Sequence, residues 1–152
     1  MTPALRNEIL RGCVILCTMM LLSLVSIVPF PIKPNIYLVT IILLAFVIDD
    51  ILVFALFLLG VLLWLKYTPF VTAELVTLGI MGMGVYGMRK MFIRDPHIAL
   101  IVGTLFVFQV LFWVIFFGKQ VFGVPLFMEF LYNVLILFVM YSVWVWVKKI
   151  FS

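Results

Sequence analysis

Two polar residues near the C-terminus, Glu129 and Asn133, are the strongest candidates for chemistry in this sequence, because long apolar runs surround them. They lie four residues apart, so an α-helix places both side chains on one face. A carboxylate and an amide on that face suit a partner helix, a bound ligand or an interfacial lysine, and ionisable groups inside apolar segments are functional candidates by default. A structural interpretation stands beside this one, in which Glu129 lies at the membrane interface near Lys119 and Asn133 bonds to a neighbouring helix.

A second group of charged residues lies at the boundaries of other apolar runs. Asp49 and Asp50 separate two such runs, and Arg89, Lys90 and Arg94 follow a later one. The two acids can bind a cation or pair with these basic residues, but we favour a solvated turn between helices, since exposed ion pairs contribute little. The basic residues are expected to fix the orientation of the chain and to contact anionic lipid headgroups.

The remaining polar residues do not predict catalysis, a cofactor or a metal. Cys13 and Cys17 lie one helical turn apart, but His97 is the one histidine of the chain, so no metal ligand set is completed. No serine or cysteine has a plausible base and no glycine loop leads into phosphate chemistry, so we expect a non-enzymatic protein. The scattered basic residues cannot form a groove for nucleic acid.

The elements that position these residues are predicted to be membrane helices. Hydrophobic residues make up 68% of the 152-residue chain and charged residues only 11%, whereas roughly 25% of residues are charged in a soluble protein. In lipid, backbone groups must be satisfied within the segment, and continuous apolar runs without alternation favour helices over a barrel. The sequence therefore predicts one all-α domain over residues 1–152, a polytopic membrane helical bundle.

Six spans are predicted, with both termini in the cytoplasm. A break at Asp49 and Asp50 avoids placing two carboxylates at mid-bilayer, which would cost roughly 2.5 to 3.5 kcal/mol each. Six spans also place seven of the ten basic residues on the cytoplasmic side, whereas five spans would divide them almost evenly. The first run lacks a small-residue cleavage pattern, so we interpret it as a retained anchor and not as a signal peptide. The spans are expected at about residues 12–32, 36–48, 51–65, 73–88, 98–117 and 126–147.

Small residues indicate where the helices are expected to pack closely. Gly60 lies in the third span, and Gly79, Gly82, Gly84 and Gly87 crowd the fourth. Small side chains let helix backbones approach each other in lipid, where packing and not the exclusion of water drives association. The four glycines of the fourth span form no single G-x-x-x-G face, so they predict close packing inside the bundle and do not establish a dimerisation motif.

Two stretches of the sequence resemble the rod shape-determining membrane proteins of the MreD family. The first covers residues 34–63, with the segment FLLGVLL at 57–63, and continues through the glycine-rich residues 79–90. The second, residues 127–135, contains Glu129 and Asn133 and is similar to the E-x-x-Y/L-N opening of the family's last span. The chain departs from the family at Trp64, where an aspartate is common.

The resemblance implies a non-enzymatic scaffold, without a cofactor, in the bacterial cytoplasmic membrane. Its implied partners are membrane lipids and the single-span protein MreC, through which it would link the cytoskeletal protein MreB to cell-wall synthesis in the elongation complex. The candidates for partner binding are Glu129, Tyr132, Asn133, Gly60, Gly79 and Gly82.

Two alternative functions remain open. The MreD fold is similar to that of the substrate-binding S components of energy-coupling-factor vitamin transporters, which implies a ligand pocket at Glu129, Tyr132, Asn133 and Gln109. Residues 12–32 contain no alanine, and this weighs against the transporter because those components usually present A-x-x-x-A surfaces on early helices. The other alternative is a small cation-coupled transporter that acts through Asp49, Asp50 or Glu74, which requires an acid deep in the membrane.

Overall fold

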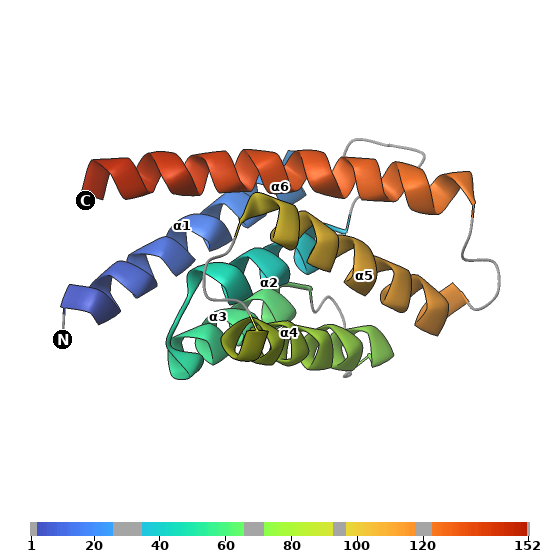
Figure 1. The fold of residues 1–152 in the computed structure, drawn as a ribbon, viewed down its shortest axis with the longest axis horizontal. Helices are drawn as coiled ribbons and strands as arrows, with labels where there is room; N and C mark the ends of the chain where they lie inside the picture. Colours follow the sequence, from blue (N-terminus) through green and yellow to red (C-terminus); the bar gives the residue numbers. More distant parts are fainter. Residues whose placement is uncertain (1–2, 26–34, 66–71, 93–96, 118–122, 152) are drawn as a thin grey trace.

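The computed structural model describes residues 3–25, 35–65, 72–92, 97–117 and 123–151, and the regular structure within these ranges is entirely helical (Figure 1). The prediction of an all-α protein with six helices is confirmed. Residues 26–32 of the expected first span lie outside the described residues. The six helices are α1 (Pro3–Val25), α2 (Ile36–Val47), α3 (Ile51–Leu65), α4 (Ala73–Phe92), α5 (Ile98–Phe117) and α6 (Val124–Phe151).

Helix α2 forms the centre of the bundle. Every residue of this helix except Tyr37 is buried, and the helix contacts each of the other five. In Figure 1, α1 and α6 lie above α2, and α3 and α4 lie below it. The sequence of α2 is apolar on all sides, which is the pattern of a helix surrounded by protein. The hydroxyl of its buried Thr40 donates to the carbonyl oxygen of Ile36 at 2.8 Å within the same helix.

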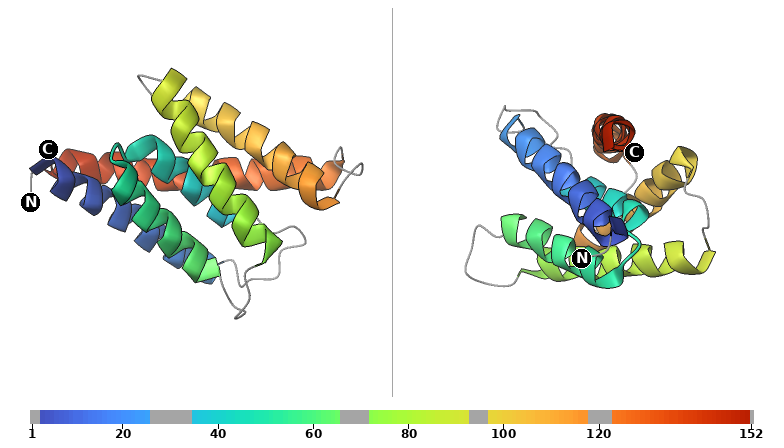
Figure 2. Two further views of the ribbon diagram at one scale, coloured as in Figure 1. Left: turned by 90° about the horizontal axis from the view of Figure 1, so that it is seen from below. Right: turned by 90° about the vertical axis from the view of Figure 1, so that its left-hand side faces the viewer.

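The helices run back and forth along the bundle, so the beginning of α1 and the end of α6 lie at the same end of the molecule (Figures 1 and 2). Helix α6 extends along the whole length of the molecule, and α5 packs beside it. The end-on view in Figure 2 shows the other helices fanning out below α6.

Among the described residues, two helices are long and apolar enough to cross a membrane by length and composition, α5 over Ile98–Phe116 and α6 over Val124–Lys149. Helices α2 and α3 are apolar but shorter. At 1.5 Å per residue, α2 extends only about 18 Å, less than the roughly 30 Å hydrocarbon core of a bilayer. Six complete spans therefore remain a prediction.

Helix α4 (Ala73–Phe92) continues one turn beyond the predicted span, which ends at about residue 88. Arg89 and Lys90 lie in the last turn of this helix and not in the loop after it. Cations are favourable near a helix C-terminus because they interact with the helix dipole. Helix α6 likewise extends beyond the predicted range of 126–147 at both ends.

Two glycines allow the close approach of neighbouring helices. A Cβ atom at Gly12 would overlap the ring of Phe57, so this glycine brings α1 against α3. A Cβ atom at Gly82 would lie 2.8 Å from Cγ2 of Ile41 and 3.0 Å from Cδ1 of Leu58, so Gly82 brings α4 against α2 and α3. A Cβ atom at Gly84 would meet nothing within 4 Å, and the same holds for Gly87. Close packing thus requires only part of the glycine-rich segment.

Candidate functional site

Two pairs of polar residues face each other between α5 and α6, and we call them the α5–α6 polar cluster. Gln109 and Trp113 lie one turn apart on α5, and Glu129 and Asn133 lie one turn apart on α6. Nε1 of Trp113 donates to Oε2 of Glu129 at 2.7 Å, and Nδ2 of Asn133 donates to Oε1 of Gln109 at 2.9 Å. The predicted common face of Glu129 and Asn133 is therefore the face that contacts α5.

The polar cluster continues to the beginning of α2 through Asn35. The backbone N–H of Asn35 donates to Oδ1 of Asn133 at 2.8 Å. The side chain of Asn35 caps α2, since its Oδ1 accepts from the N–H of Leu38 at 3.0 Å. An N-cap of this kind satisfies one of the backbone donors that a helix start leaves unpaired. Asn133 thus joins three helices, α2, α5 and α6.

The polar cluster becomes more deeply buried from Glu129 inward. Glu129 is 8% exposed, Gln109 is 1% exposed and Asn133 is completely buried. The contact of Trp113 with Glu129 was not predicted from the sequence; the four-residue spacing of Trp113 from Gln109 was the available signal. Tyr132 is half-buried on the same helix as Glu129. Lys119, the partner expected in the structural interpretation, lies outside the described residues.

A second set of polar contacts surrounds the turn between α2 and α3. Oδ1 of Asp49 lies 2.7 Å from Nη2 of Arg89 and 3.7 Å from Nζ of Lys90. Nη1 of Arg89 donates to the carbonyl oxygen of Ile48 at 3.0 Å, and the hydroxyl of Tyr86 donates to the carbonyl oxygen of Asp49 at 2.6 Å. These contacts hold the end of α4 against the end of α2, and we call them the clamp at the end of α2. Arg94, the third basic candidate, lies outside the described residues.

Asp50 connects the same turn to α1 and α3. Its Oδ1 accepts from the N–H groups of Leu52 at 2.8 Å and Val53 at 3.1 Å, which caps the start of α3. Its own N–H donates to Oε2 of Glu8 on α1 at 3.0 Å. Asp49 and Asp50 are both exposed, but hydrogen bonds and ion pairs fix their positions, so the turn is solvated and ordered at the same time.

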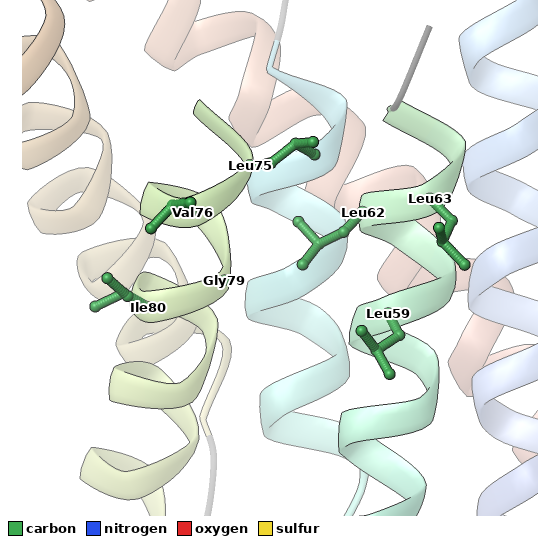
Figure 3. A pocket seen from close by; sticks show the side chains of 7 residues that line it. All are labelled: Leu59, Leu62, Leu63, Leu75, Val76, Gly79 and Ile80. Carbon is green, nitrogen blue, oxygen red and sulfur yellow. The ribbon is translucent and has the colours of Figure 1, made fainter. Parts of the chain in front are cut away.

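An apolar groove runs between α3 and α4 near the point where α3 ends and α4 begins (Figure 3). Its volume is about 440 Å³. Of the three candidate glycines, Gly79 lines this groove, whereas Gly60 faces Leu16 of α1 and Gly82 is buried against α2 and α3. The structure therefore does not bring the three together. The lining residues are Leu59, Leu62 and Leu63 from α3 and Leu75, Val76, Gly79 and Ile80 from α4.

The described part of the chain contains no group of three or more His, Cys, Asp and Glu side chains that could hold a metal ion. Cys13 and Cys17 are free thiols on the exposed side of α1. The polar residues described above connect helices of the chain through hydrogen bonds and ion pairs.

Comparison of the chain with protein-family models, with curated proteins and with solved structures found no match. The relation to the MreD family is thus a proposal that rests on the residues quoted above.

Proposed function

We propose that this chain is a non-enzymatic membrane scaffold of six helices that docks the membrane-spanning helix of a partner protein in the groove between α3 and α4. The observation that carries the proposal is the groove itself, since apolar side chains from two helices line it and a glycine lies in its wall. Helix association in lipid depends on such close van der Waals contact at small residues.

The membrane location is supported by the apolar surface of the bundle. Large apolar side chains are exposed along α3 to α6, including Leu56 at 70% and Ile80 at 67%. Soluble monomers rarely expose contiguous apolar patches larger than a few hundred Å². Lipid contact explains this surface together with the two helices, α5 and α6, that are long enough to span a bilayer.

The orientation with cytoplasmic termini is supported by the charged residues at one end of the bundle. Contacts of Asp49 and Asp50 bring Arg89 and Lys90 of α4 and Glu8 of α1 to the same end. The end of α6, with Lys148 and Lys149, lies on that side as well. Basic residues concentrate on the cytoplasmic side of membrane proteins.

The groove suits a single apolar helix better than a soluble partner. The walls of the groove contain Leu63 at 67% exposure and Val76 at 48% exposure, and the described residues that line it carry no charge. The resemblance to the MreD family suggests MreC as the protein that supplies this helix and the cell-wall elongation complex as the setting.

Affinity purification of the full-length protein from bacterial membranes in mild detergent tests the proposal. We expect an MreC-type single-span protein to co-purify with the wild type and not with Gly79→Phe, whose ring would fill the groove. Gly84→Phe is the matched control, because this position of the same helix is exposed and a Cβ atom added there meets nothing within 4 Å. Equal recovery with both variants, or recovery of lipid alone from the wild type, would contradict docking in the groove.

A further inference from the structure

The α5–α6 polar cluster contains a buried donor that no acceptor among the described residues satisfies. Nε2 of Gln109 has no hydrogen-bond partner in that part of the chain, and the residue is only 1% exposed. A buried polar group without a partner costs roughly 1 to 3 kcal/mol. Such groups in native proteins need an explanation, which includes an acceptor that comes from outside the chain.

The direction of the hydrogen bonds shows that rotating the Gln109 amide would not give its N–H₂ group a partner. The backbone N–H of Asn35 can only donate, so it must face Oδ1 of Asn133. The amide nitrogen of Asn133 then points to α5, where it requires the oxygen of Gln109. Rotating the Gln109 amide would place two N–H₂ groups against each other. The unpaired donor is therefore a fixed property of the polar cluster.

The acid of the polar cluster also lacks a compensating charge among the described residues. Both ion pairs found in that part of the chain belong to Asp49, at the opposite end of α2. The carboxyl group of Glu129 accepts a hydrogen bond from Nε1 of Trp113 and also interacts with the side-chain amide of Asn133. Buried charges are normally paired. Glu129 and Gln109, on the two sides of Asn133, thus present a carboxylate for a cation and a free donor for an acceptor.

We propose that the α5–α6 polar cluster binds a small amino alcohol-type group, with its ammonium on the carboxylate of Glu129 and its oxygen on Nε2 of Gln109. The ligand must be short, because both groups flank one Asn133 side chain and the polar cluster is at most 8% exposed at any of Gln109, Glu129 and Asn133. This chemistry occurs in free ethanolamine and in the headgroup of phosphatidylethanolamine. The site is separate from the α3–α4 groove and does not depend on the docking proposal.

Thermal unfolding of the purified full-length protein in detergent tests the site, with ethanolamine as the probe and choline as its control. Choline also has a cationic nitrogen and a hydroxyl group, but its nitrogen has no N–H donor. The buffer must be phosphate, because Tris is itself an amino alcohol. We expect ethanolamine to raise the Tm saturably and choline to leave it unchanged. Native mass spectrometry with phosphatidylethanolamine against phosphatidylcholine then distinguishes the two sources, since preferential retention of the first identifies the lipid headgroup.

Variants connect the effect to the named residues. We expect Glu129→Gln to abolish the ethanolamine shift and Gln109→Met to weaken binding about tenfold, the effect of losing one hydrogen bond of about 1.4 kcal/mol. Glu74→Gln, an exposed acid on α4, should keep the full shift. An equal shift with choline, an unchanged shift in Glu129→Gln, or binding of neither ethanolamine nor phosphatidylethanolamine by the wild type would overturn the proposal. The comparison of ethanolamine with choline uses only the wild-type protein, so it still tests the proposal if a variant fails to fold.

Discussion

Replacing Asn133 with leucine would remove both the acceptor of the Asn35 N–H group and the donor to Gln109. These hydrogen bonds measure 2.8 and 2.9 Å, and Asn133 is completely buried. Hydrogen bonds between membrane helices contribute about 0.6 kcal/mol on average and about 1.7 kcal/mol at most. We therefore expect Asn133→Leu to lower the free energy of unfolding by about 1 to 3 kcal/mol.

Replacing Gln109 with methionine should cost much less, although Gln109 takes part in the same hydrogen bond. The change removes the acceptor of Asn133 but also removes the amide nitrogen that has no partner. The two effects have opposite signs and similar size, about 1 kcal/mol each. The expected change in unfolding free energy is within about 1 kcal/mol of zero.

The assay is unfolding in mixed micelles by increasing SDS, followed by tryptophan fluorescence in a buffer without amines. Thr104→Val serves as the control, since the Thr104 hydroxyl donates only to the carbonyl oxygen of Leu100 in its own helix. If Gln109→Met were as destabilising as Asn133→Leu, the assigned direction of the hydrogen bonds would be wrong.

Two further predictions concern the clamp at the end of α2 and the packing of α4. Arg89→Met should lower the unfolding free energy by about 1 to 3 kcal/mol, because it leaves the Ile48 carbonyl without its donor. Lys90→Met removes a longer and more exposed contact, so it should change the unfolding free energy by less than about 0.5 kcal/mol. Similar losses for the two variants in the SDS assay would contradict the role assigned to Arg89. Gly82→Ala should destabilise the fold by about 1 to 3 kcal/mol through overpacking. Gly84→Ala should be neutral or should stabilise the fold by up to about 1 kcal/mol, because alanine favours the helix. Thermal melts that show the reverse order would refute the packing described for α4.

The sequence predicted the helices well because apolar runs and charged boundaries are local signals. It also placed Glu129 and Asn133 on one face, since helical spacing depends only on the residues between them. It could not identify Trp113 and Gln109 as their partners, because that contact depends on the register of α5 against α6. It also did not show that α4 continues to Phe92, where Arg89 in its last turn contacts Asp49, a residue far away in the chain.

The α3–α4 groove could not be predicted from the sequence either. Gly79 and Gly82 look alike in the sequence, as two glycines in one apolar run. Only the placement of α2 distinguishes them, because Gly82 packs against Ile41 and Gly79 lies in the open groove. A pattern along one helix therefore predicts that small residues pack, but not which of them remains available to a partner.

The hydrogen bond between Asn35 and Asn133 has a consequence for biosynthesis, because it spans 98 residues. Helix α2 leaves the ribosome long before its last neighbour, and at about 5 to 20 residues per second the delay is about 5 to 20 s. During that interval the start of α2 lacks the Asn133 acceptor, and the helix is too short to cross a bilayer unaided. In the proposed membrane location, insertion helix by helix therefore cannot complete the fold, because α2 lacks its last contacts until α6 is inserted.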